Sequence, residues 1–225
     1  MSHSHQDQRL PHGRAIPSME DNSSRYPRDY QQALSNKLTR EEVTHLLNKR
    51  GCAPRFVYGV LMLPTVLSHY LNASQTENIA KQMTPATLQG HKLYQIGPGS
   101  TPVMLPSSNP LDIVEGMLIF GLDADQRNAI YETESGLMDL VNVQVNFTQV
   151  DSMLQEHVIL SQRVVDAGAF VWVGARDGLM PLGESAWSVD EFLDSQFYEN
   201  MCLSRRTSMM ELREKFVSDL LENIL

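Results

Sequence analysis

The 225-residue sequence predicts an α+β fold, a small mixed or antiparallel β-barrel with flanking helices. Two observations predict it. Short apolar runs rich in strand-forming residues recur through the middle of the chain, separated by Gly and Pro turn signals, with few helical stretches between them. Capped, amphipathic helical segments gather mainly towards the two ends of the chain.

The N-terminal part divides into two segments. Residues 1–28 are polar, rich in His, Ser, Arg and Pro, and show no sustained apolar period, which predicts a disordered tail. Residues 29–52 are predicted as a helical extension, with a first short helix at 29–36. Thr39 and Glu42 then form a capping box that opens a second helix. We expect this extension either to dock onto the main domain or to meet a partner.

The central domain is predicted over residues 53–200. It opens with an apolar run that ends at Tyr58, bends at Gly59 and continues into a short helix that begins at Pro64. The polar residues 72–84 are predicted as a loop or an exposed helix. Further strands are expected within 86–96, 103–106, 112–121, 139–148 and 164–173.

Three helices are predicted after the middle of the chain. Asp123 caps a helix through Ile130, and a capping box at Ser188 opens a helix that ends near Tyr198, after a loop at 174–183. The segment 201–225 is predicted as a C-terminal helix, with an apolar face that closes the core or binds another chain.

Composition and charge narrow the class of protein. A net charge of −9 and a pI near 5.2 argue against a nucleic-acid surface, which needs clustered Lys and Arg. The chain begins without an apolar signal segment and has no apolar stretch of the ~18 residues that cross a bilayer. Cys52 and Cys202 lie far apart and form no metal or redox pair. These features predict a cytoplasmic protein that binds neither nucleic acid nor membrane, and they leave the oligomeric state open.

Two stretches are candidates for chemistry. The turn at Tyr58-Gly59 can aim several backbone N–H groups at one point and so bind an anion, although a buried strand that ends in a turn gives the same pattern. Glu132 and Glu134 lie between a short helix and a strand, where partial desolvation would raise the pKa of a carboxyl towards the range used in proton transfer. The alternative is a pair of solvated loop acids. No Ser-His-Asp or Cys-His spacing, phosphate loop or Rossmann glycine pattern is present.

Several short motifs in order resemble the gamma-glutamylcyclotransferase-like family, in particular its branch of plant avirulence-induced gene proteins. The resemblance covers about residues 55–195. Its motifs are a strand with a Tyr-Gly-x-Leu-Met turn, an Ala-x-Leu-x-Gly-x-x-Leu-Tyr segment, a strand with flanking prolines, a Val-x-Gly-x-Leu strand and a Leu-Asp-x-x-Glu-Gly stretch. They align with residues 56–62, 86–94, 102–106, 114–118 and 130–136 of this sequence, where the Leu-Asp is replaced by Ile130-Tyr131.

The resemblance implies a small barrel whose pocket lies at the Tyr-Gly turn. It implies that backbone N–H groups of the turn residues Tyr58, Gly59, Val60 and Leu61 bind the α-carboxylate of a γ-glutamyl substrate. Glu134 aligns with the family's general acid and base, which moves protons while the α-amino group attacks the γ-carbonyl and 5-oxoproline is released. The implied partner is a small molecule, and the implied reaction uses no metal or cofactor.

Two positions depart from the family pattern. Val60 stands where Thr or Ser is usual, and Met138 stands where Tyr is usual. Glu132 is the alternative to Glu134 if the alignment is shifted by two, because both would face the same way on an extended chain. Three functions therefore stay open: a gamma-glutamyl cyclotransferase acting on an amine or peptide, a family member recruited to another small molecule such as a secondary metabolite, and a non-enzymatic binding protein.

Overall fold

The computed structural model describes residues 25–71, 78–96, 101–136, 138–154, 157–182 and 188–203. Most of the predicted N-terminal tail and the predicted helix within 201–225 from residue 204 onwards lie outside the described residues. The described chain begins at Arg25, slightly before the predicted end of the tail. The ring of Tyr26 packs edge-on against Tyr30, 5.3 Å away between ring centroids, so this part already belongs to the fold.

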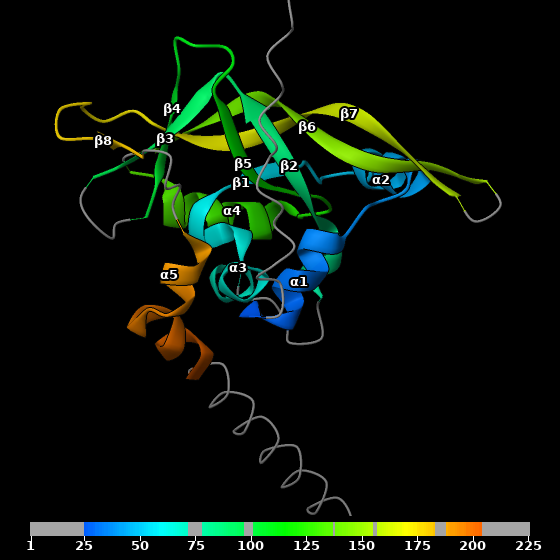
Figure 1. The fold of residues 1–225 in the computed structure, drawn as a ribbon, viewed down its shortest axis with the longest axis horizontal. Coiled ribbons are helices and arrows are strands. Elements are labelled where there is room, and N and C mark those ends of the chain that lie inside the picture. The colour runs from blue at the N-terminus through cyan, green and yellow to red at the C-terminus, as the bar shows by residue number, and fades with distance from the viewer. Residues whose placement is uncertain are drawn as a thin grey trace, which may run out of the picture.

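A closed barrel forms the centre of the molecule (Figure 1). Around the barrel, β1 is antiparallel to β5 and parallel to β7, and the other neighbours are antiparallel, which confirms the predicted mixed barrel. In order around the barrel the strands are β1 (Arg55–Val57), β5 (Ile113–Ile119), β2 (Met83–Gln89), β6 (Met138–Leu154) and β7 (His157–Trp172).

A smaller sheet lies beside the barrel and contains β4 (Val103–Pro106), β3 (His91–Gln95) and β8 (Met180–Pro181), in that order. The prediction of a loop over 174–183 is wrong at β8. Its two residues pair with Tyr94 and Gln95, and this pairing turns an irregular segment into a short edge strand. The sequence gives little sign of it, because two residues are too few to show alternation.

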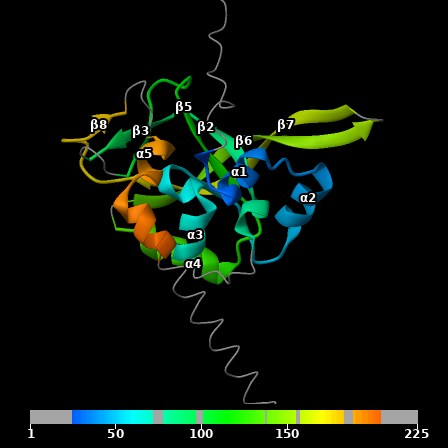
Figure 2. The same cartoon turned by 60° about the horizontal axis from the view of Figure 1, so that its bottom comes forward.

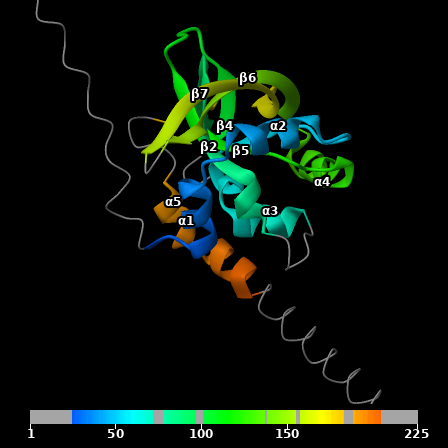
Figure 3. The same ribbon diagram turned by 90° about the vertical axis from the view of Figure 1, so that its right-hand side faces the viewer.

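Helices cover one side of the barrel (Figures 1 and 3). They are α1 (Arg28–Ser35), α3 (Pro64–Tyr70), α4 (Ala124–Glu134) and α5 (Val189–Leu193), and a short 3-10 helix follows β1 at Gly59–Met62. One apolar cluster, which includes Phe56 and Val145, fills the barrel. A second cluster, which includes Tyr30 and Leu67, lies between the barrel and the helices.

The N-terminal extension is part of this core. Tyr30 and Ala33 of α1 are fully buried, and α2 (Arg40–Asn48) has the predicted capping box at Thr39 and buries Val43. The N–H of Val150 in β6 donates to the carbonyl of Leu38 at 2.9 Å. Of the two expectations for this segment, docking onto the main domain is therefore the one that the structure shows.

Several predicted boundaries shift. Residues 78–84, expected as loop or exposed helix, contain a 3-10 helix at Ile79–Gln82 and the buried start of β2 at Met83. The strands β6 and β7 extend beyond the predicted 139–148 and 164–173, because each pairs with the other along a long hairpin. The helix predicted from Ser188 ends at Leu193, and helical structure resumes over residues 196–203.

Candidate active site

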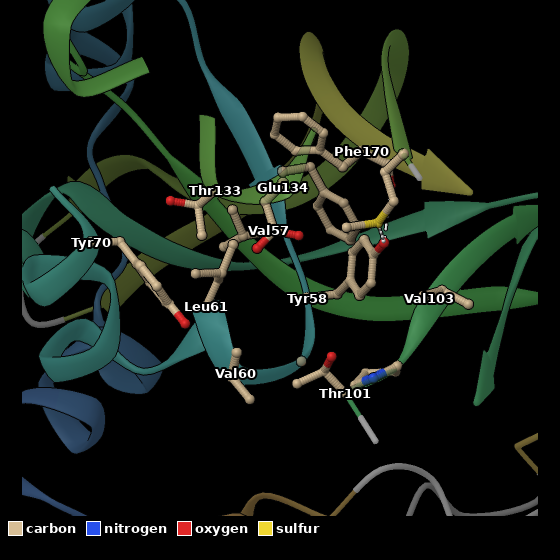
Figure 4. Close-up of a pocket in the computed structure, with 14 residues that line it drawn as sticks. Val57, Tyr58, Val60, Leu61, Tyr70, Thr101, Val103, Thr133, Glu134 and Phe170 are labelled. Atoms are coloured by element: carbon tan, nitrogen blue, oxygen red, sulfur yellow. Dashed lines mark hydrogen bonds between the residues drawn. The ribbon is translucent and has the colours of Figure 1, made fainter. Parts of the chain in front are cut away.

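A pocket with a volume of about 270 Å³ opens where β1 ends and the 3-10 helix begins (Figure 4). Its wall is formed by the end of β1, the turn after it, the segment leading into β4, the end of α4 and one residue each from α3, β6 and β7. The lining residues are Phe56, Val57, Tyr58, Gly59, Val60, Leu61, Tyr70, Thr101, Pro102, Val103, Thr133, Glu134, Met138 and Phe170. A concave, mostly apolar site with a few polar groups is the usual form of a small-molecule site.

The turn at Gly59 requires glycine for two reasons. Its φ of +60° lies in the left-handed region, which side chains other than glycine rarely adopt. A Cβ added there would also lie 2.8 Å from Cγ of Pro102. The turn leads directly into the 3-10 helix, whose first backbone N–H groups have no partner within the helix. The predicted strand, turn and helix at this point are confirmed.

Tyr58 fixes the turn to two strands. Its hydroxyl donates to the carbonyl of Phe170 in β7 at 3.0 Å and accepts from the N–H of Met104 in β4 at 3.2 Å. The same oxygen lies 3.5 Å from Sδ of Met138. Burial raises the pKa of Tyr58, so the side chain stays protonated and keeps its donor. The phenol therefore serves as a brace between β1, β4 and β7.

Glu134 lies in the last turn of α4, which runs four residues further than predicted. Figure 4 shows its carboxylate pointing into the pocket between Leu61 and Tyr58. Desolvation by burial raises the pKa of this carboxyl. In a carboxyl with a raised pKa the ionised form is a stronger base, and the acid form is more available near neutral pH.

Glu132 is not equivalent to Glu134. The two would face the same way on an extended chain, but they are part of a helix, where two residues rotate the side chain by roughly 200°. Glu132 is exposed and does not line the pocket, while Glu134 does. The extended-chain expectation is therefore wrong, and the structure distinguishes the two carboxylates by burial.

The other polar groups of the pocket are hydroxyls. Tyr70 of α3 faces the site, and its pKa is raised by burial first and by the negative charge of Glu134 second, so it remains a protonated donor near that carboxyl. Thr101 and Thr133 add two further hydroxyls. Among the described lining residues none is Lys, Arg or His, so an anion bound here would rely on backbone N–H groups and hydroxyls.

The structure brings together all of the residues that the resemblance assigned to the site: Glu134, Tyr58, Gly59, Val60 and Leu61. Met138, one of the departures from the family pattern, also lines the pocket. Sequence reasoning missed Tyr70, Thr101 and Phe170 as pocket residues. Tyr70 lies on the helix predicted from Pro64, and nothing in the sequence around Phe170 distinguishes a pocket residue from a core residue.

Within the described residues, no three of His, Cys, Asp and Glu lie together in a group that could hold a metal ion. In the same part of the chain, no helix is both long enough and apolar enough to cross a membrane.

Comparison with known protein families points to the same family as the sequence motifs. The sequence model described as "Gamma-glutamyl cyclotransferase, AIG2-like" matches residues 55–189, more than half of the chain. No curated protein sequence matches significantly.

Similar solved structures come from a plant and an archaeon. The solution structure of At5g39720.1 from Arabidopsis thaliana is 18% identical with a TM-score of 0.43, covering 74% of this chain and 95% of that chain. At3g28950.1 from Arabidopsis thaliana is 19% identical with a TM-score of 0.42, covering 72% and 84%. The uncharacterized protein PH0828 from Pyrococcus horikoshii is 17% identical with a TM-score of 0.38, covering 62% and 92%.

The family match begins at the first residue of β1 and extends past the turn, the pocket and Glu134 to the start of α5. It contains the motifs that carried the resemblance, in the same order. On the strength of this match over residues 55–189, the chain belongs to the gamma-glutamyl cyclotransferase, AIG2-like family.

Proposed function

We propose that this protein is a gamma-glutamyl cyclotransferase that releases 5-oxoproline from a γ-glutamyl amine or peptide, with Glu134 as general acid and base. The observation that supports the proposal most is the position of Glu134, a partly buried carboxyl in the pocket wall beside the glycine turn. Glu134 is the one carboxyl among the described lining residues, so it is the natural group for both proton transfers.

The substrate would be held folded. Backbone N–H groups at Gly59, Val60 and Leu61 are suited to bind the α-carboxylate, and the Tyr58 brace fixes the turn that presents them. A folded γ-glutamyl group places its α-amino nitrogen close to its own γ-carbonyl carbon. The attack is then intramolecular, and holding this geometry supplies a large part of the rate.

The proposed chemical step is balanced without water. The α-amino nitrogen forms a bond to the γ-carbonyl carbon, and the Glu134 carboxylate takes a proton from that nitrogen. The bond from the carbonyl carbon to the leaving nitrogen then breaks, and Glu134 returns the proton to the leaving amine. One substrate molecule gives one 5-oxoproline and one free amine, and one carboxyl in two protonation states serves both transfers.

The experiment that tests this proposal identifies the products. The full chain is incubated with a panel of γ-glutamyl amines, γ-glutamyl amino acids and γ-glutamyl peptides, and 5-oxoproline, glutamate and the free amine are measured by mass spectrometry. We expect equal amounts of 5-oxoproline and amine from at least one member and no glutamate. Release of glutamate would indicate hydrolysis, and no release from any member by folded protein would contradict the proposal.

A second candidate function is supported by Val60 and Met138. Both line the pocket at positions where the family usually has a hydroxyl. A more apolar wall would keep the acid–base carboxyl but favour a different, less polar small molecule. Val60→Thr restores the usual hydroxyl. If this variant released more 5-oxoproline than wild type, the wild-type pocket would be better suited to a small molecule other than the γ-glutamyl compounds of the panel.

A non-enzymatic role has less support. A non-enzymatic role predicts a filled pocket with Glu134 turned to solvent, whereas Glu134 lines an open pocket and is partly buried.

A further inference from the structure

Two phenols line the pocket that holds Glu134, and only one of them already has an acceptor. The hydroxyl of Tyr58 donates to the carbonyl of Phe170 and so serves the brace. Tyr70 also lines the pocket, and among the residues that the structure describes its hydroxyl has no hydrogen-bond partner. An unused donor in a mostly apolar wall is available to a bound ligand.

Helix α3 brings Tyr70 to the pocket. Val66 and Leu67 of this helix are fully buried, which fixes one of its faces on the core. Tyr70 follows Leu67 by three residues, on the same face and at the last position of the helix. Because α3 and α4 lie side by side (Figures 1 and 2), Tyr70 and Glu134 enter the pocket from neighbouring helices.

The hydroxyls of the two threonines in the described lining are less suited to a ligand. Thr133 donates its hydroxyl to the carbonyl of Ala129 in its own helix at 2.9 Å. Thr101 is exposed, so water competes for its hydroxyl, whereas Tyr70 is half-buried. A donor in a water-excluded site stabilises charge more than the same donor in water. Tyr70 therefore supplies the shielded, uncommitted hydroxyl of the site.

The proposed reaction requires such a donor. With the turn N–H groups on the α-carboxylate, the γ-carbonyl oxygen still needs a partner. When the α-amino nitrogen bonds to the γ-carbonyl carbon, the π electrons of the carbonyl move to its oxygen, where negative charge develops. Glu134 has then taken the proton of the amine and is neutral. Because none of the described lining residues is Lys, Arg or His, stabilisation of this oxyanion falls to a hydroxyl.

We propose that the hydroxyl of Tyr70 is the catalytic donor to the γ-carbonyl oxygen, a role that rests on the proposed cyclotransferase function. The phenol keeps its proton throughout. Collapse of the intermediate re-forms the carbonyl and expels the leaving nitrogen, which receives its proton from Glu134. Burial and the charge of Glu134 both raise the pKa of Tyr70, so the donor is present across the neutral pH range.

The first test compares 5-oxoproline release by wild type, Tyr70→Phe and Tyr131→Phe. We expect Tyr70→Phe to lose about 10²- to 10³-fold in kcat, the usual loss for one oxyanion donor, and by the same factor across the neutral pH range. Tyr131→Phe is the matched control, because Tyr131 is 49% exposed and does not line the pocket. It should keep the wild-type rate.

Two results would overturn the role of Tyr70 alone. One is an active wild type with a Tyr70→Phe variant that is equally fast. The other is a variant whose pH profile of kcat is shifted, since that would place the hydroxyl on Glu134 rather than on the substrate. A wild type that releases no 5-oxoproline would overturn the proposed function, and the role of Tyr70 with it.

The second test requires no turnover. The γ-carbonyl oxygen becomes the lactam carbonyl of 5-oxoproline, so Tyr70 should also bind the product. Calorimetry measures the affinities of wild type and Tyr70→Phe for 5-oxoproline and for cyclopentanecarboxylate, which keeps the ring and the carboxylate but lacks the lactam carbonyl. We expect the variant to bind 5-oxoproline about two- to tenfold more weakly and cyclopentanecarboxylate equally well. Equal weakening for both ligands would indicate a change in pocket shape and contradict the proposal.

Discussion

Glu134 is the residue whose ionisation links the proposed function to stability. Burial raises the pKa of its carboxyl in the folded state above that in the unfolded chain. Above the folded pKa, the folded protein bears the full cost of a desolvated carboxylate. As the pH falls through the folded pKa, the folded state takes up a proton before the unfolded chain does, so this group favours folding increasingly until the unfolded pKa is passed.

We therefore expect Glu134→Gln to raise the free energy of unfolding above the folded pKa of Glu134, and the difference from wild type to shrink as the pH is lowered. Urea unfolding of both proteins at a series of pH values measures this difference in the free energy of unfolding. Glu132→Gln is the control, since Glu132 is exposed and should show no such trend. A Glu134→Gln difference that stays constant with pH would mean that the carboxyl is not desolvated.

Tyr58 gives a second prediction at this scale. Tyr58→Phe removes the hydroxyl that joins the carbonyl of Phe170 to the N–H of Met104 and leaves both backbone groups buried without it. Such a loss costs about 1–3 kcal/mol. The measurement is the free energy of unfolding from urea denaturation. A variant as stable as wild type would show that the brace is not needed to hold the turn.

For single residues, the sequence indicated which residues belong to the site better than it indicated where each of them lies in the fold. The motif order identified Tyr58, Gly59 and Glu134 correctly as neighbours in space. It could not separate Glu134 from Glu132, because that depends on whether the chain there is helical or extended. Tyr70, 64 positions before Glu134 in sequence, meets it only through the packing of α3 on α4.

The turn at the end of β1 is the element on which the site depends. Gly59→Ala places a side chain in the left-handed region at a cost of roughly 1–2 kcal/mol and adds the contact with Pro102. We expect a lower melting temperature for this variant. We also expect its affinity for a γ-glutamyl substrate to fall by a larger fraction than its helix content, which circular dichroism measures. Gly51→Ala is the matched control, because Gly51 also has a positive φ but has open space around it. Equal effects of the two variants would contradict a special role for this turn.

Helix α1 gives the second prediction for an element. Tyr30 is fully buried against the helix layer, and among the residues that the structure describes its hydroxyl has no hydrogen-bond partner. Tyr30→Ala should cost about 3–5 kcal/mol, as for other large buried rings. Tyr30→Phe, which removes only the unpartnered hydroxyl, should leave the stability unchanged or raise it. If Tyr30→Ala were harmless in urea denaturation, α1 would be an appendage after all.

For secondary structure, local signals predicted where elements begin better than where they end. The capping boxes at Thr39 and Asp123 both start helices in the structure. The end of α4 was missed because Tyr131 to Glu134 lack a strong stop signal before Gly136. The lengths of β6 and β7 depend on their mutual pairing, and β8 exists only because β3 offers it an edge.

At the scale of the whole molecule, the barrel and the helix layer together create the pocket. The carboxyl comes from α4, the N–H groups from the turn after β1, and the walls from α3, β6 and β7. The fold class could be predicted because strand-like runs and turn signals are local. The depth of the pocket, and the burial of Glu134 within it, arise from contacts between segments far apart in sequence.

The proposed function depends on Glu134 moving the protons of a cyclotransferase reaction. The most direct measurement is the rate of 5-oxoproline release by wild type, Glu134→Gln and Glu132→Gln with the best γ-glutamyl substrate of the panel. We predict that Glu134→Gln loses about 10²- to 10⁴-fold in kcat, the usual contribution of a general acid–base group, while Glu132→Gln keeps the wild-type rate. A Glu134→Gln variant as fast as wild type, or an equal loss in both variants, would contradict the proposed role of Glu134.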